Sequence, residues 1–163
     1  MKNKSILSIF LAIFCLSLIG NVLSEEIYFE TPEILAFENG NLLKALKGGK
    51  ALTDTKVEII ADEFEYNKVT NILEATGNVK IDDQKNKIIL YGKKVIYNKN
   101  EEKFRSIDAE AITADNMKII ADEIEYNKIT NILVAIGNVK IDDPKKQFVL
   151  YGEKSRHDRS VML

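Results

Sequence analysis

Residues 59–94 read IIADEFEYNKVTNILEATGNVKIDDQKNKIILYGKK, and residues 119–154 read IIADEIEYNKITNILVAIGNVKIDDPKKQFVLYGEK. The two stretches are identical at 26 of 36 positions, with a constant offset of 60 residues. A fixed period of this length is typical of an architecture built by stacking copies of one unit. Several differences, such as Phe64 against Ile124, exchange one apolar residue for another, which a packed β-face tolerates. The duplication therefore predicts two equivalent structural units.

Within each copy, apolar residues alternate with polar ones. Between Leu73 and Ile81 every odd position is apolar or Gly and every even position is polar, and 133–141 repeats this with a more apolar outer face. A period of two is typical of a strand with one buried face. Three further segments are rich in β-branched and aromatic residues, namely 57–66, 88–98 and 147–152. Polar joints such as 67–71 and 82–86 separate the segments as turns.

The sequence therefore predicts an all-β protein of about eight to ten antiparallel strands. No segment beyond the first 24 residues shows sustained helical periodicity, and 101–111, the ambiguous stretch, is interpreted as a strand. A single sheet of this size would leave one apolar face in water. The sheet must therefore fold over on itself as a sandwich or jelly roll, with open edges at its end strands.

The first 24 residues have the features of a secretory signal peptide. Two lysines precede an apolar run from Ile6 to Ile19, and Val22 and Ser24 stand at the −3 and −1 positions of a cleavage site. The run of about 14 residues is shorter than the roughly 20 that span a bilayer. We interpret residues 1–24 as a cleaved signal peptide, and an uncleaved N-terminal anchor is the alternative.

The composition argues against several classes of function. The net charge is −2 and no basic patch outweighs the acids, so no nucleic-acid partner is expected. Cys15 is the only cysteine and lies in the leader, and His157 is the only histidine, so neither a thiol site nor a metal site is expected. The acidic pairs, of which Asp82 with Asp83 is one, are interpreted as solvated charge. We predict no enzyme, no catalytic residue, no cofactor and no metal.

The motifs ADEFEYN at 61–67 and LEATGNV at 73–79, both present again in the second copy, resemble the OstA-like family of lipopolysaccharide-transport proteins. In that family an A-D-x-hydrophobic-x-Y strand is followed by L-x-A-x-G-N-V. The stretch 27–41 resembles the start of the periplasmic N-terminal domain of LptD, and LptA is a similar member. The resemblance extends over about residues 27–154. It implies an OstA-like domain at 25–154, folded as an open, V-shaped antiparallel β-jelly roll.

The resemblance also implies a function in Gram-negative outer-membrane assembly. Such a module lies in the periplasm, binds lipopolysaccharide through the acyl chains of lipid A, and stacks edge to edge on other Lpt jelly rolls. It reaches the outer membrane only through these partners. An acyl chain gains roughly 0.8 kcal/mol per buried methylene. The expected lipid-binding residues are the apolar faces of the two alternating strands: Leu73, Ala75, Val79, Ile81, Leu133, Ala135, Val139 and Ile141.

The same apolar faces also fit a closed core without a ligand. The second interpretation is therefore a repeat-built structural or adhesive secreted β-protein. Gly77 and Gly137 fit both interpretations, because a glycine on the apolar side of a strand either forms a bulge or leaves room for a lipid chain.

The repeat fails before the end of the sequence. The offset of 60 places Ser155-Arg156-His157-Asp158 where the first copy has Val95-Ile96-Tyr97-Asn98. We predict that 155–163 is an aberrant, disordered tail. The two interpretations are an LptD-like chain truncated before its barrel and a short, bridge-like homologue.

The signal peptide gives a direct prediction: the mature N-terminus is Glu25, because Val22 and Ser24 satisfy the small-residue rule for cleavage. N-terminal sequencing of protein recovered from the periplasm measures this. An intact Met1, or a lipid-modified Cys15, would contradict it.

Overall fold

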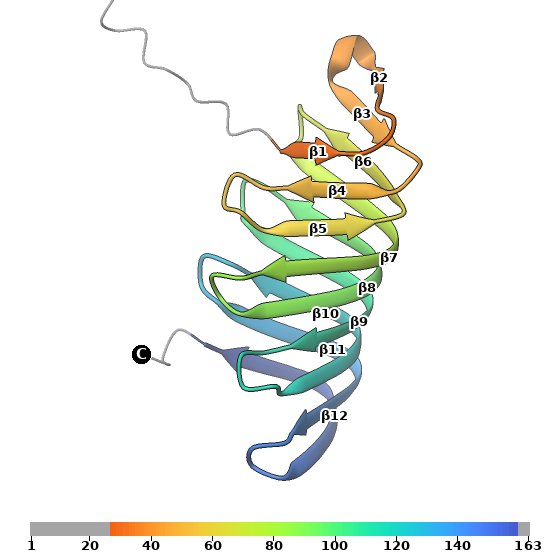
Figure 1. Cartoon of the computed structure of the whole chain (residues 1–163). Coiled ribbons are helices and arrows are strands. Elements are labelled where there is room, and N and C mark those ends of the chain that lie inside the picture. The colour runs from red at the N-terminus through yellow and green to blue at the C-terminus, as the bar shows by residue number, and fades with distance from the viewer. Residues whose placement is uncertain (1–26, 160–163) are drawn as a thin grey trace, which may run out of the picture.

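The computed structural model describes residues 27–159, and the predicted signal peptide lies outside this part of the chain. The described residues form twelve strands in one antiparallel sheet (Figure 1) and a 3-10 turn, η1 (Glu38–Gly40), which confirms the all-β class. None of their segments is a helix long and apolar enough to span a membrane. The strands are β1 (Tyr28–Glu30), β2 (Leu35–Phe37), β3 (Leu42–Ala45), β4 (Gly49–Leu52), β5 (Glu58–Ala61), β6 (Glu63–Asn67), β7 (Ile72–Asp83), β8 (Ile88–Asn98), β9 (Lys103–Ile112), β10 (Lys118–Asn127), β11 (Ile132–Asp143) and β12 (Phe148–Asp158).

The sheet divides at β7 into two branches. The first half of β7 pairs with β6, which leads to β3 and β2, whereas its second half pairs with β5, which leads to β4 and β1. From β7 onward the strands follow one another to β12 (Figure 1). Each long strand thus contributes one half to each of two layers. Layer 1 comprises β2, β3, β6 and residues 72–76, 94–98, 103–107, 123–127, 132–136 and 154–158, and layer 2 comprises β1, β4, β5 and residues 79–83, 88–92, 109–112, 118–121, 139–143 and 148–152.

A corner joins the two halves of β7. Its register against β8 shifts between Thr76 and Val79, and Gly77 and Asn78 have positive φ values of 77° and 47°. Asp62 stabilises the corner, since its N–H donates to the Gly77 carbonyl at 3.0 Å and its Oδ2 accepts from Asn78 Nδ2 at 2.8 Å. A Cβ on Gly77 would collide with the Asp62 carboxylate, so the position requires glycine. The bulge interpretation of Gly77 is confirmed.

The second copy contains the same corner in β11. Asp122 Oδ2 accepts from Asn138 Nδ2 at 2.9 Å, Gly137 has a φ of 76°, and a Cβ there would again collide with the aspartate. The aspartate of the first motif and the Gly-Asn pair of the second are therefore the residues that bend the sheet.

The core lies between the two layers. Leu90 and Tyr97 of β8 belong to different layers, and both are buried. Phe29 of layer 2 packs against Phe64 of layer 1 with ring centroids 5.8 Å apart, and it also contacts Tyr66 of that layer at 6.2 Å. The two inner faces therefore pack on each other, as the predicted jelly roll requires.

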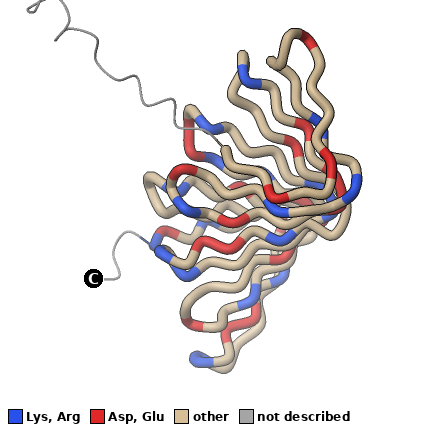
Figure 2. The backbone as a smooth tube through the Cα atoms, turned by 45° about the horizontal axis from the view of Figure 1, so that its top comes forward, with Lys and Arg blue, Asp and Glu red and all other residues tan. Residues whose placement is uncertain are grey.

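Lys, Arg, Asp and Glu residues are spread over neighbouring strands of the sheet (Figure 2). Lys44 of β3 pairs with Glu65 of β6 at 2.7 Å, and Lys118 of β10 pairs with Glu110 of β9, also at 2.7 Å. Such exposed pairs contribute about 0–1 kcal/mol each. Burial of the inner faces must therefore supply most of the stability.

The structural repeat extends further toward the N-terminus than the sequence repeat. Leu43 of β3 lies opposite Tyr66, as Phe104 of β9 lies opposite Tyr126. In the other layer, Ala51 of β4 lies opposite Ile59 of β5, as Ala111 of β9 lies opposite Ile119 of β10. Together β3 and β4 therefore occupy the place of one long strand. The backbone ladder is retained there although the side chains have diverged, so sequence identity does not reveal it.

The end of β12 corrects one prediction. The expected disordered tail at 155–163 is wrong for 155–158, because β12 continues to Asp158, which lies opposite Ile132 of β11. Ladder hydrogen bonds join backbone groups and need no apolar side chain, and Arg156 and Asp158 of this segment point to solvent. Residues 160–163 lie outside the described part of the chain.

The corner predicts a sharp difference among glycines. Gly77→Ala should destabilise the protein by about 1–3 kcal/mol, because alanine is strained at positive φ and collides with Asp62. Gly152→Ala is the matched control, since no atom lies within 4 Å of the position that its Cβ would take, and it should cost under about 0.5 kcal/mol. Urea unfolding of both variants measures the difference. Equal midpoints would contradict the role of Gly77.

Candidate functional site

The residues predicted to bind lipid all face the interior, but the structure places them in two environments. Seven of the eight are buried, with at most 3% of their surface exposed, and Ile141 is half-buried. The four in the first copy are covered by neighbouring strands and by the opposite layer. Lipid binding by the full set stays a prediction, and the residues accessible to a ligand lie in the second copy.

A comparison of the two copies locates the open part of the interior. Leu90 of β8 is 0% exposed, whereas Leu150, at the same place in β12, is 53% exposed. Ile81 is likewise buried and its counterpart Ile141 is half-buried. The side chains are the same, so the difference comes from the strands that cover them. Strand β8 is followed by β9 and β10, whereas no strand of the described residues pairs with the second edge of β12 (Figure 1).

A cavity lies at this open end. It has a volume of about 180 Å³, and its floor contains Val139 and Ile141 from the predicted set together with Leu150. Tyr151, Gly152, Lys154 and Ser155 complete the lining. The site thus combines an apolar surface with one lysine, a chemistry suited to an apolar chain that carries a nearby anionic group.

The opposite end of the interior is closed by aromatic packing. Phe29 of β1 covers Phe64 and Tyr66 of β6, and the small residues Ala45 and Ala51 beside them are buried. At the β1 end, Phe29 thus covers the inner face of β6, although Leu35 and Phe37 of β2 are exposed, whereas the β12 end leaves apolar inner surface in contact with water.

The middle of the interior is filled by three stacked rings. Tyr97 and Phe104 lie 4.4 Å apart between centroids, and Phe104 and Tyr126 lie 6.0 Å apart. The Tyr126 hydroxyl donates to Asp83 Oδ2 at 2.8 Å, and burial, followed by the charge of Asp83, raises the pKa of Tyr126 above its ordinary value. Asp83 itself is 1% exposed, so its interpretation as a solvated charge is wrong. Its tyrosine partner is distant in sequence, and nothing in the local motif indicated it.

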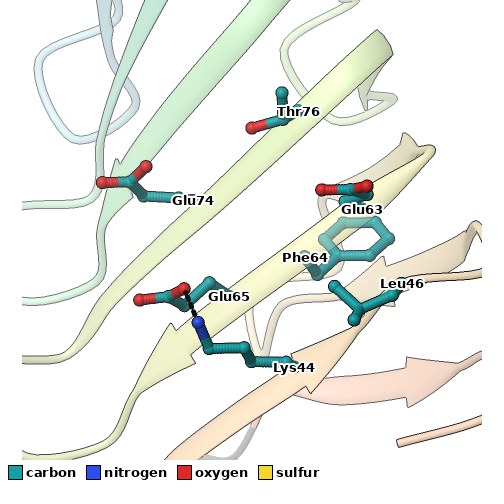
Figure 3. Close-up of a pocket in the computed structure, with 7 residues that line it drawn as sticks. All are labelled: Lys44, Leu46, Glu63, Phe64, Glu65, Glu74 and Thr76. Carbon is teal, nitrogen blue, oxygen red and sulfur yellow. Dashed lines mark ion pairs between the residues drawn. The ribbon is translucent and has the colours of Figure 1, made fainter.

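A second hollow lies on the outer surface over β3, β6 and β7 (Figure 3). It has a volume of about 150 Å³, and Glu63, Glu65 and Glu74 give it an acidic lining. Two of these carboxylates are already paired, Glu65 with Lys44 and Glu74 with Lys94. The hollow is therefore a salt-bridged polar surface and offers no apolar chain a binding site.

The described residues contain no cluster of three His, Cys, Asp or Glu side chains that could hold a metal ion. His157, on the inner face of β12, has its pKa lowered by partial burial and by the nearby Arg159. The chemistry that the site supports is non-covalent binding of an apolar group.

Two comparisons with known proteins agree with this geometry. Residues 58–160 match the model of the family described as LptA/(LptD N-terminal domain) LPS transport protein. The fold is similar to the crystal structure of LptH from Pseudomonas aeruginosa, the LptA-homologous periplasmic component of its lipopolysaccharide transport device. The TM-score is 0.59 at 11% identity, and the match covers 83% of this chain and 96% of that chain, which confirms the predicted fold. No curated protein sequence matches significantly.

The open end can be tested by equivalent truncations in the two copies. Leu90→Ala should cost about 2–5 kcal/mol because it creates a cavity in a packed core. Leu150→Ala should cost under about 1 kcal/mol because that side chain is already half in water. Thermal or urea unfolding compares the two. Equal losses would show that the interior at β12 is covered in solution.

Proposed function

Because the chain belongs to the LptA/LptD N-terminal domain family of LPS transport proteins, we propose that it is a periplasmic carrier of lipopolysaccharide that binds acyl chains of lipid A at its open end. The observation that carries this proposal is the apolar cavity at β11 and β12, floored by Val139, Ile141 and Leu150. The transfer is a binding equilibrium without covalent chemistry. No catalytic residue is therefore assigned.

The size of the cavity limits what it holds. Pockets that enclose a drug-sized ligand measure about 300–1,000 Å³, so a cavity of about 180 Å³ receives part of one acyl chain. The remaining chain lies along the uncovered inner face near Leu150, where each buried methylene contributes roughly 0.8 kcal/mol. Lys154 at the rim supplies a cation for a lipid A phosphate.

The exposed edge of β12 suggests how the site is completed. A jelly-roll partner that adds its strand to this edge would form backbone hydrogen bonds along it. The added strand would cover Leu150 and Ile141, as β9 covers Leu90 in the first copy. Partner binding would thus extend the apolar interior from one module into the next. The interpretation as an LptD-like chain without its barrel stays a prediction, which the gene sequence downstream of Leu163 tests.

One observation favours the second candidate, a structural or adhesive repeat protein without a ligand. Seven of the eight residues expected to bind lipid lie in a packed core. A decisive experiment must therefore compare lipid capture at the open end with lipid capture on the outer face of the sheet, where no binding is expected.

Photo-crosslinking makes this comparison. A photo-reactive residue at Leu150 should capture lipopolysaccharide, because this side chain faces the cavity and is 53% exposed. The same residue at Lys140, which lies on the outer face of β11, should capture several-fold less, since neighbouring strand positions point to opposite faces. Circular dichroism first establishes that both variants fold. Equal capture at both positions, or no capture by folded protein, would favour the structural repeat.

A further inference from the structure

Buried polar contacts join the two layers in the middle of the interior. Tyr126, at the end of β10 in layer 1, donates its hydroxyl to Asp83 Oδ2, at the end of β7 in layer 2, at 2.8 Å. Asn86, in the turn after β7, donates Nδ2 to both the Asp83 carboxylate and the Tyr126 hydroxyl, each at 2.8 Å, and its N–H donates to Asp83 Oδ1 at 3.1 Å. The three side chains form one closed set of hydrogen bonds.

The turn after β10 makes a second link to layer 2. Lys128 Nζ donates to the Thr55 carbonyl, in the turn between β4 and β5, at 3.0 Å, and lies 3.7 Å from Glu102. The Lys128 side chain is 7% exposed. The end of β10 therefore holds two neighbouring turns of the opposite layer, and these contacts lie where the free ends of the two layers meet.

This arrangement is unusual as a device for stability alone. A buried carboxylate without a cation beside it is costly, and apolar residues of similar volume commonly replace such groups without loss of stability. No ion pair to Asp83 is found within residues 27–159. Hydrogen bonds depend steeply on distance and direction, so a small separation of the layers breaks the whole set. Contacts of this kind join two layers reversibly.

The equivalent aspartate of the second copy has different partners. Asp143 occupies the place of Asp83, but Lys146 replaces Asn86, and Lys146 Nζ lies 3.8 Å from Asp143 Oδ2. Its Oδ1 accepts instead from the N–H groups of Lys145 and Lys146 at 3.1 and 3.0 Å.

We propose that Asp83, Asn86 and Tyr126 form a latch that keeps the two layers together in the middle of the jelly roll. An acyl chain bound at the open end then passes further along the interior only when the latch opens. The latch acts directly on the path of the chain, because the Tyr126 ring belongs to the stack that fills the interior. This inference rests on the proposed function, since it concerns the route of the same ligand.

The test measures how deep lipid reaches. Purified lipopolysaccharide is offered to protein with a photo-reactive residue at Leu150, at the open end, or at Leu90 of β8, which is buried deeper in the interior. In the wild type, capture at Leu150 should exceed capture at Leu90. Tyr126→Phe keeps the ring and removes the hydroxyl, and it should raise capture at Leu90 by about tenfold, equivalent to about 1.4 kcal/mol. Capture at Leu150 should not change.

Tyr97→Phe is the matched control, because it removes a hydroxyl from the same aromatic stack and leaves in place the Tyr126 hydroxyl that donates to Asp83. It should leave capture at both positions unchanged. If Leu150 captures no lipid in any protein, the proposed function fails. If Leu150 captures lipid but Tyr126→Phe leaves capture at Leu90 unchanged, or if Tyr97→Phe raises it equally, the latch is overturned and the proposed function stands.

Amide hydrogen exchange provides a second measurement that needs no substitution at Leu90. Opening of the latch exposes the turn at 83–88 and the end of β10, so adding lipopolysaccharide should speed exchange there. The corner at Gly77, which stays closed, should exchange at the same rate with and without lipid. Slower or unchanged exchange at 83–88 while lipid is bound would overturn the latch.

Discussion

The corner at which a long strand passes from layer 1 to layer 2 is the constraint on which the fold depends. In β7 the chain turns through Gly77 and Asn78, both at positive φ, while Asp62 accepts from the asparagine side chain and donates to the glycine carbonyl. Without this corner the strand would continue straight, and one apolar face of a twelve-stranded sheet would remain in water. The corner restricts few positions in each copy and leaves the inner residues free to vary in apolar type.

A sheet folded in this way buries its inner face without closing on itself. Within residues 27–159, β8 is covered by the strands that follow it, whereas β12 has a neighbour on one edge only and exposes part of its inner face. Leu90 and Leu150 show this directly, because the same residue in the same register is buried in one copy and half exposed in the other. The candidate site of the described chain therefore lies at the strand that pairs on one edge only. An interaction edge and an apolar cavity arise together at that place.

Local sequence predicted those parts of the fold that depend on local chemistry. Alternation placed Leu73 and Val79 on the inner face, and both are buried. The burial of Asp83 could not be predicted in the same way, because its partner Tyr126 lies 43 residues away and an Asp-Asp pair before a turn normally indicates solvent. The strand at 155–158 was missed because its ladder depends on the neighbouring β11 and not on its own apolar residues. Exposure at the open end also depends on which strands of the described chain lie beside β12, and no residue of the site itself encodes this.

The two functions considered for the chain are a structural repeat protein with a closed core and a lipid carrier. They differ in whether the space between the two layers can admit an acyl chain. A fully sealed apolar interior would bind an acyl chain only at the large cost of separating two packed layers, and a fully open one would expose its apolar surface when empty. A polar link at Asp83 and Tyr126 avoids both extremes in the proposed carrier. Once the layers separate, water can hydrate the freed carboxylate and hydroxyl, so the polar part of the cost of opening is that of a few hydrogen bonds, each contributing about 0.5–3 kcal/mol, and the acyl chain replaces the apolar contacts that the rings lose. That cost is comparable to the gain from burying a few methylenes at roughly 0.8 kcal/mol each, so an advancing acyl chain can itself provide the free energy that opens its path.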